Sequence, residues 1–190
     1  MTPLAGVVAV GSSLGGLLAL EALLKGLEPS FPGAIVVAQH RVPDSEGRLV
    51  ELLQRHSRLP VCEPDDKQPI APGQVYLAPS NYHLIVERGF FSLSVDPPVC
   101  FARPSIDVLF ESVADSYGPR GIAVMLTSSN EDGADGAAAV KNAGGRVLVQ
   151  DPRTAESAVG PRAVIARVAV DGILPLEGLP ARLMHAFASS

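Results

Sequence analysis

Residues 7–24 read VVAVGSSLGGLLALEALL, and this stretch decides the fold. It opens with four small or β-branched apolar residues, which favour a buried strand. It closes with leucines and alanines at helical spacing, and Gly26 then marks the end of the helix. Between the two lies the turn 11–16, GSSLGG. The stretch therefore predicts a strand, a tight turn and a helix, which is the first unit of an α/β fold.

A second unit of the same kind follows. Residues 34–38 form another apolar strand, residues 43–45 (PDS) break the pattern, and leucines within 49–53 mark a helix. Strands that are apolar throughout are typical of parallel sheets covered on both faces, and a helix is the usual crossover between parallel strands. The first 56 residues thus predict a doubly wound sheet.

The pattern changes between residues 61 and 99, where short strands are separated by Pro and Gly. This predicts a small antiparallel insertion with strands at 75–78, 83–87 and 91–95. Helix and strand then alternate again. We expect helices at 105–117, 132–143, 161–165 and 179–187, and extended segments at 121–127, 146–150 and 167–170. The expected fold is a three-layer α/β domain over residues 1–190, with a doubly wound, mostly parallel sheet and a small antiparallel insertion.

Composition excludes several classes of protein. Of 190 residues, 47% are hydrophobic and 18% charged, and the net charge is −5, which does not fit a disordered chain. No apolar run reaches the roughly 20 residues of a membrane span, and no basic tract offers a footprint for nucleic acid. The start of the chain fits a signal peptide poorly, so we expect a cytoplasmic protein in which Cys62 and Cys100 are buried thiols.

The turn 11–16 is the first place to look for chemistry, because ligands bind beyond the carboxyl ends of parallel strands. Its glycines do not match G-x-G-x-x-G, and no Lys follows Gly16, so neither a dinucleotide site nor a P-loop is predicted. The turn does match G-x-S-x-G with Ser13 at the centre, which is typical of a nucleophile elbow. The alternative is that Ser13 only caps the helix that follows.

A nucleophilic serine needs a base and a carboxylate that orients the base. His40 ends the second strand, and Asp132 follows the strand predicted at 121–127, so both should lie on the same edge as Ser13. We therefore predict a Ser13, His40, Asp132 triad, with His40 Nε2 facing the serine. Taken alone, Asp132 fits an ordinary helix N-cap better than a catalytic residue, and its position on the same edge as a serine and a histidine is what favours the triad.

The other histidines are weaker candidates. His56 is expected to be solvated, His83 to be structural or to line a cleft, and His185 is a rival base only under a different chain order. No His, Cys, Asp and Glu residues show the spacing of metal ligands, so we predict no metal and no cofactor.

The triad residues lie within five ordered blocks that resemble the catalytic domain of the chemotaxis protein-glutamate methylesterases. Residues 10–16 (VGSSLGG) resemble the family's serine turn I-G-A-S-T-G-G, and 37–40 (VAQH) its histidine strand end. Residues 76–84 (YLAPSNYHL) are similar to Y-I-A-P-x-x-x-H-L, and 103–110 (RPSIDVLF) to R-P-S-V-D-V-L-F. Residues 155–161 (AESAVGP) resemble the late segment A-S-S-x-V-x-G-M-P.

The resemblance implies a serine hydrolase that demethylates glutamate γ-methyl esters on the cytoplasmic helices of chemoreceptors, and in some members deamidates glutamine there. It implies that Ser13 is the nucleophile, His40 the general base and Asp132 the orienting carboxylate. It places the oxyanion donors at the backbone N–H groups of Leu14 and Ser129. Arg103 to Asp107 and His83 would frame the cleft, and methylated receptor helices would be the partner.

Two departures from the family pattern leave alternatives open. The family loop L-T-G-M-G-x-D-G reads LTSSNEDG at 126–133, which predicts a reshaped oxyanion loop in which Asn130 adopts a positive φ. The phosphorylatable receiver domain that usually precedes the catalytic domain is not in this sequence, so a separate receiver protein is a candidate partner. The alternatives are a catalytically weakened module that acts in signalling, and an esterase acting on a small ester outside chemotaxis.

Overall fold

A computed structural model describes residues 4–40 and 48–188. Within them lies a seven-stranded parallel sheet in the order β3-β4-β2-β1-β7-β8-β9. Its strands are β1 (Val7–Ser12), β2 (Ala34–Gln39), β3 (Val61–Cys62), β4 (Gln74–Leu77), β7 (Gly121–Met125), β8 (Arg146–Gln150) and β9 (Gly172–Leu174). A separate antiparallel hairpin is formed by β5 (His83–Val86) and β6 (Phe91–Ser94).

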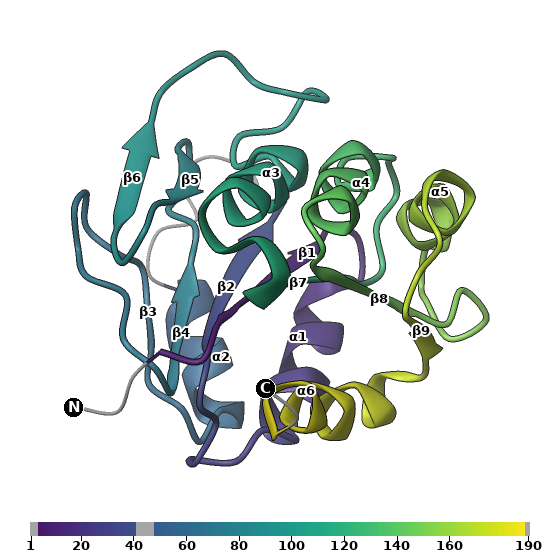
Figure 1. Ribbon diagram of the computed structural model, residues 1–190. Coiled ribbons are helices and arrows are strands. Elements are labelled where there is room, and N and C mark those ends of the chain that lie inside the picture. The colour runs from purple at the N-terminus through teal and green to yellow at the C-terminus, as the bar shows by residue number, and fades with distance from the viewer. Residues whose placement is uncertain (1–3, 41–47, 189–190) are drawn as a thin grey trace.

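Helices cover both faces of the sheet, as Figure 1 shows. One face carries α3 (Ile106–Tyr117), α4 (Ala134–Asn142), α5 (Val159–Arg167) and the hairpin, and the other carries α1 (Gly16–Lys25), α2 (Arg48–His56) and α6 (Leu179–Ala188). Short 3-10 turns lie at Gly118–Arg120 and Leu176–Gly178. The three-layer, doubly wound fold with a small antiparallel insertion is thus confirmed. None of the described helices is long and apolar enough to cross a membrane.

The central strand shows why the sheet forms. All six residues of β1 are buried, and they alternate between the two cores: Val7 and Ala9 face α3, whereas Val8 and Val10 face α1. A strand buried on both faces reads as one apolar run, and this is the pattern at 7–10 that predicts the fold.

Several predicted elements differ from the structure. The segment predicted as a first insertion strand is β4, which pairs in parallel with β2 and belongs to the main sheet. Its buried run Val75–Leu77 is typical of a parallel strand covered on both faces. The extended piece predicted at 167–170 is also wrong, because α5 continues to Arg167 and the edge strand is β9. The break predicted at 43–45 lies outside the described residues.

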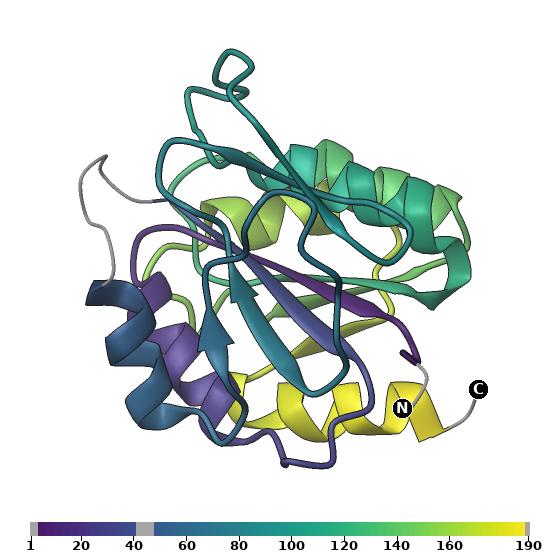
Figure 2. The same ribbon diagram turned by 90° about the vertical axis from the view of Figure 1, so that its left-hand side faces the viewer.

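The prediction that both cysteines are free thiols is confirmed, but the prediction that they are buried is wrong. Cys62 and Cys100 are both free, and no disulfide joins them. Cys62 is only half-buried, however, and Cys100 is exposed in the loop between β6 and α3. That loop rises above the α3 layer in Figures 1 and 2.

Candidate active site

Ser13, His40 and Asp132 lie at the carboxyl edge of the sheet. Ser13 follows β1, His40 follows β2, and Asp132 ends the loop after β7. The strands β2 and β7 flank β1 on opposite sides, so the chain reverses its direction of winding here. Such a switch point is where open α/β sheets leave a crevice for a ligand.

The serine turn depends on glycines at positions where a side chain would not fit. Gly15 has φ +76°, a backbone conformation that residues other than Gly rarely adopt. A Cβ on Gly16 would collide with the side-chain amide of Gln39, and one on Gly11 would collide with Ile106 of α3. The turn can therefore lie tightly between β2 and α3, with Ser13 half-buried at its tip.

Gln39 holds the ends of β1 and β2 together. Its Nε2 donates hydrogen bonds of 2.9 Å to the carbonyl oxygens of both Ser13 and His40. Its Oε1 accepts a 2.5 Å bond from Ser12 Oγ, and the His40 N–H donates to the Ser12 carbonyl at 3.0 Å. One buried amide thus fixes the main chain of the serine relative to that of the histidine.

His40 and Asp132 form a direct pair, with Nε2 of His40 2.7 Å from Oδ2 of Asp132. Asp132 is fully buried, whereas His40 is partly open to solvent. Because Nε2 faces the carboxylate, Nδ1 is the nitrogen left for the serine, and the prediction that Nε2 faces Ser13 is wrong. Within the described part of the chain, Ser13 Oγ makes no hydrogen bond, a looseness that sites without substrate often show.

Four donors surround the Asp132 carboxylate. Oδ1 accepts from Ser105 Oγ at 2.8 Å and from the Asp107 N–H at 2.9 Å, and Oδ2 accepts from His40 and from the Ile106 N–H at 2.7 Å. Burial alone would raise the pKa of Asp132, but these hydrogen bonds outweigh it and hold the pKa below its usual value. The carboxylate therefore stays ionised beside the histidine.

Asp132 is a helix cap, although not of the helix that follows it. The N-cap of α4 is Gly133, with φ +105°, and α4 begins at Ala134 rather than at 132. Asp132 instead accepts the first N–H groups of α3, where a helix dipole favours a negative charge. The capping interpretation and the catalytic one are therefore compatible.

Asp107 lies next to this carboxylate and is also buried. Its Oδ1 accepts hydrogen bonds from the N–H groups of Gly133 and Gly136, at 2.9 and 2.7 Å, and its Oδ2 lies 3.8 Å from the Cys100 thiol. Burial, and then the negative charge of Asp132, raise the pKa of Asp107 to about 6, although the Gly136 N–H opposes them. Cys100, Asp107 and Asp132 each offer a ligand atom within 4.8 Å of the others, but the two carboxylates already accept these backbone donors.

Within residues 4–40 and 48–188, the two expected oxyanion donors have no internal partner. Neither the Leu14 N–H nor the Ser129 N–H donates a hydrogen bond to another described residue, and both residues are exposed. Thr127 fixes the loop beside them, because its Oγ1 donates to the Leu14 carbonyl at 2.8 Å and accepts from the Ser157 N–H at 2.9 Å. Both N–H groups therefore remain available for a developing oxyanion.

In the changed loop after β7, neither Ser128 nor Asn130 has a left-handed backbone conformation. The predicted positive φ of Asn130 is therefore wrong. The hydroxyl of Ser128 shapes the loop instead: it donates to Asn130 Oδ1 at 3.1 Å and accepts from the Asn130 N–H at 3.4 Å. Ser128 also bridges to Ala158 beside α5. A local hydrogen-bond network thus stands where the family pattern has glycines.

The other histidines behave as expected. His56 is exposed, 3.7 Å from Glu21, and His83 is buried, accepting the Ser105 N–H at Nδ1 and contacting the Pro97 carbonyl with Nε2. His185 is exposed on α6. It lies two residues before Phe187, which packs against Gly6 at the amino end of β1, so it is at the opposite end of the strand from Ser13.

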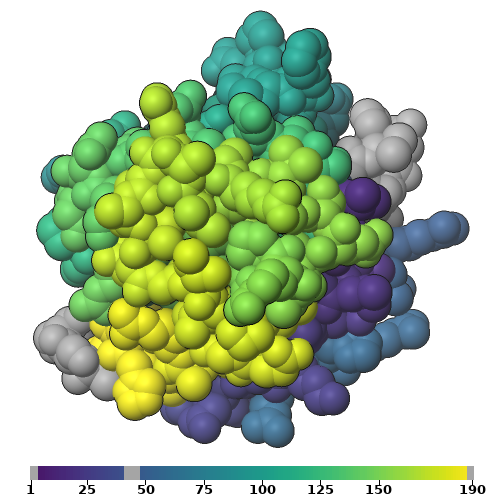
Figure 3. Space-filling model, turned by 90° about the vertical axis from the view of Figure 1, so that its right-hand side faces the viewer, coloured from purple at the N-terminus to yellow at the C-terminus, as the bar shows by residue number. Residues whose placement is uncertain are grey.

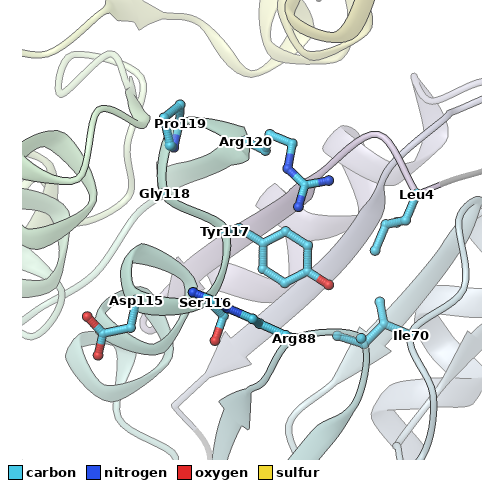
Figure 4. A pocket seen from close by; sticks show the side chains of 10 residues that line it. Leu4, Ile70, Arg88, Asp115, Ser116, Tyr117, Gly118, Pro119 and Arg120 are labelled. Carbon is cyan, nitrogen blue, oxygen red and sulfur yellow. The ribbon is translucent and has the colours of Figure 1, made fainter.

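The cleft beside the triad is not the largest cavity. A cleft of about 360 Å³ is lined by His40, Asn130 and the loop at 98–104. A cavity of about 570 Å³ lies at the other end of the sheet, where α3 ends and β7 begins; Figure 4 shows Tyr117 and Arg120 in its wall. None of the triad residues lines that cavity, so the smaller cleft is the one placed for chemistry.

Sequence reasoning missed Gln39 and Thr127, which fix the main chain around Ser13, and it gave Ser105 and Asp107 only a loose place in the cleft wall. Ser105 carries a readable signal, because Ser before an apolar helical pattern is a common N-cap and its Oγ accepts the Val108 N–H. Gln39 directly precedes His40, but nothing in the sequence indicates that its amide reaches back to Ser13.

The fold and this site define a class: doubly wound α/β proteins in which a serine turn, a histidine and a buried aspartate meet at the carboxyl edge of a parallel sheet. A model of the CheB methylesterase family matches residues 8–183. The chain therefore belongs to the CheB methylesterase family, and the predicted resemblance is confirmed.

Relatives and a solved structure agree with this assignment. A putative protein-glutamate methylesterase/protein-glutamine glutaminase of Leptospira interrogans is 42% identical over 90% of this chain and 89% of its own length. A protein-glutamate methylesterase/protein-glutamine glutaminase of Anaeromyxobacter dehalogenans is also 42% identical, over 93% of this chain but only 52% of its own length. The crystal structure of the Thermotoga maritima CheB methylesterase catalytic domain matches with a TM-score of 0.91 and 35% identity, over 95% of this chain and 97% of that one.

Proposed function

We propose that this protein is a serine hydrolase that removes the methyl group from glutamate γ-methyl esters of proteins. The observation that carries the proposal is the His40–Asp132 pair, with its fully buried carboxylate, beside a serine turn whose main chain Gln39 holds to that of His40. The matching family and the names of the relatives support an ester hydrolase acting on glutamate side chains.

In the proposed mechanism, Ser13 Oγ attacks the ester carbonyl carbon while Nδ1 of His40 takes the hydroxyl proton. Asp132 holds the ring through Nε2 and stabilises the positive charge that forms on it. The N–H groups of Leu14 and Ser129 stabilise the oxyanion. His40 then gives its proton to the leaving methoxide, which departs as methanol, and the acyl group stays on Ser13.

The second half of the reaction uses the same residues. His40 takes a proton from water, the hydroxide attacks the acyl-enzyme carbonyl, and the proton returns to Ser13 Oγ as the C–O bond breaks. The products are a glutamate side chain and the regenerated enzyme. The names of the relatives also include protein-glutamine glutaminase, and the same acyl-enzyme would form from a glutamine amide with loss of ammonia.

We propose methylated chemoreceptor helices as the protein substrate, in signal adaptation within the cytoplasm, with a separate receiver protein as a candidate regulator. The deciding experiment measures methanol release from a methylated receptor fragment by the wild type and by Ser13→Ala. We expect release by the wild type and a loss of several orders of magnitude in the variant. Equal rates would contradict the role of Ser13. Cleavage of a small aryl ester without any release from the receptor fragment would favour the small-ester alternative.

A further inference from the structure

The loop between β6 and α3 presents an aromatic side chain to solvent at the mouth of the candidate active site. Phe101 is fully exposed at its tip, and Val95 and Val99 are exposed below it. The loop rises above the α3 layer in Figure 2, and in the space-filling view of Figure 3 the teal segment projects beyond the rest of the surface. Among the described residues, no ring contact or hydrogen bond involves the Phe101 side chain.

The tip is a strained turn. Cys100 and Phe101 both have positive φ, 49° and 62°, and the turn is closed by backbone hydrogen bonds of 3.1 and 2.9 Å between Val99 and Ala102. Residues other than Gly adopt this region at a cost, and for a bulky aromatic residue such a φ is an outlier. A strained turn that exposes Phe needs a reason outside the stability of the fold.

Side-chain hydrogen bonds hold the loop in place. The guanidinium of Arg103 donates to the carbonyl oxygens of Val95 and Asp96, at 2.6 and 3.0 Å, and to Asn81 Oδ1 at 3.1 and 2.6 Å. His83 Nε2 lies 3.1 Å from the Pro97 carbonyl. The main chain at the base of the loop is therefore held in one orientation, which lowers the entropy cost of ordering the loop when a partner binds.

Phe101 and His40 of the triad line the same cleft. The walls of this cleft, of about 360 Å³, also include Asn81, Asn130 and further residues of the loop at 98–104. A protein segment whose ester lies beside His40 therefore also lies close to Phe101. Of the loop residues that line the cleft, Arg103 alone is charged, and its guanidinium donates hydrogen bonds to Asn81 and to the Val95 carbonyl.

We propose that Phe101 is a specificity-determining contact for the protein substrate, and that it packs against an apolar residue of the substrate segment next to the esterified glutamate. The inference rests on the proposed function, because it assigns the site a protein rather than a small ester. Aromatic side chains of this kind often carry a large share of the binding energy of an interface. A small ester fills only the space around Ser13 and does not need this contact.

The variant that isolates the contact is Phe101→Asn. Asn tolerates a positive φ better than most residues, so the turn is kept while the apolar surface is lost. Phe101→Leu keeps an apolar side chain at the same place, and Ile173→Asn changes an exposed apolar residue of the edge strand β9, away from the cleft. Each variant is assayed with a methylated receptor fragment and with p-nitrophenyl acetate.

We expect Phe101→Asn to lower kcat/KM for the receptor fragment about tenfold, through KM, and to leave p-nitrophenyl acetate unaffected. Phe101→Leu should recover most of the loss, and Ile173→Asn should match the wild type. The inference is overturned if Phe101→Asn cleaves the receptor fragment like the wild type, or if it loses both activities equally, since an equal loss means that the residue only maintains the site.

Binding separates this inference from the proposed function. In a Ser13→Ala background, the affinity for the receptor fragment is measured with Phe101 and with Phe101→Asn. Weaker binding by the double variant supports the contact whether or not the wild type releases methanol. Unchanged binding, or no binding in either background, overturns it. Failure of the wild type to release methanol from a fragment that it binds overturns the proposed reaction alone.

Discussion

Asp107 and Asp132 cap each other's helices. The carboxylate of Asp132, which precedes α4, accepts the Asp107 N–H at the start of α3, and the carboxylate of Asp107 accepts the N–H groups of Gly133 and Gly136 at the start of α4. The two amino ends, and their dipoles, therefore converge on two buried negative charges. This reciprocal arrangement places Asp132 against His40 without any freedom to turn.

The first prediction concerns Asp132→Asn. The amide has only one acceptor oxygen, so two of the four donors around it lose their partner in a fully buried place. We expect the free energy of unfolding to fall by about 2–4 kcal/mol. We expect kcat to fall at least about a thousandfold, because the histidine loses the carboxylate that orients it.

Asp135→Asn is the matched control, since Asp135 is exposed in the first turn of α4 and pairs with Arg167 at the surface. Chemical denaturation and methanol release compare the two variants, and Asp135→Asn should stay within about 1 kcal/mol of the wild type. If both variants kept their activity, Asp132 would be a helix cap and nothing more.

The second prediction concerns Ser105→Ala, which removes one donor to Asp132 together with the N-cap of α3. We expect a loss of about 1 kcal/mol in stability and, because three donors still hold the carboxylate, only about a tenfold fall in kcat.

Ser116→Ala provides the comparison, because it removes one hydroxyl hydrogen bond, to the Val86 carbonyl, at the far end of the same helix. Its stability should fall by a similar amount while kcat stays unchanged. A loss of kcat as large as that of Ser105→Ala would show that the effect comes from the stability of α3 rather than from the position of Asp132.

Local patterns explain why much of this molecule could be predicted. The run 7–10 and the turn 11–16 each specify their structure within a few residues, and so the strand, the elbow and the position of Ser13 on the sheet edge follow from them. The prediction of an antiparallel insertion strand at 75–78 is wrong because a short apolar strand among turns is typical of a hairpin. In the structure this strand, β4, pairs in parallel with β2. Pairing between strands 40 residues apart leaves no local signal.

The sequence predicts which residues form the site, but it does not predict how their side chains contact one another. The order of strands brings residues 13, 40 and 132 to one edge, but the carboxylate of Asp132 that faces His40 is also held by the Ile106 N–H of α3, 26 residues earlier in the chain. The same holds for Gln39, whose amide reaches the Ser13 carbonyl because Gly16 has no Cβ that would collide with it. Contacts between distant segments decide these details, and no spacing along the chain encodes them.

The third prediction is a pH dependence of stability that comes from Asp107. Its pKa in the folded protein is about 6, above the ordinary value of 3.8, so the folded state holds this proton more tightly than the unfolded chain. The associated stability is complete below about pH 4 and is lost as the pH rises through 6. The full rise of the pKa from 3.8 to about 6 corresponds to roughly 3 kcal/mol, most of which is present at pH 4.

Asp107→Asn removes this titration but keeps an oxygen that can accept the Gly133 and Gly136 N–H groups. The stability of the wild type relative to the variant should therefore fall by roughly 2 kcal/mol between pH 4 and pH 7. Urea denaturation of both proteins at several pH values measures this difference, in which the carboxyl groups that do not interact with Asp107 cancel. A difference that is constant with pH, or that grows in favour of the wild type, would contradict the raised pKa.

The last prediction concerns Gly16→Ala at the start of α1. Its Cβ would collide with the amide of Gln39, which holds the carbonyl oxygens of Ser13 and His40. We expect a loss of about 1–3 kcal/mol in stability and a fall of at least about tenfold in kcat, because the amide must move and both main chains move with it. Gly178→Ala is the control, since the nearest atoms to its Cβ lie at 3.7–3.8 Å. Full activity of Gly16→Ala would mean that Gln39 does not position the two residues.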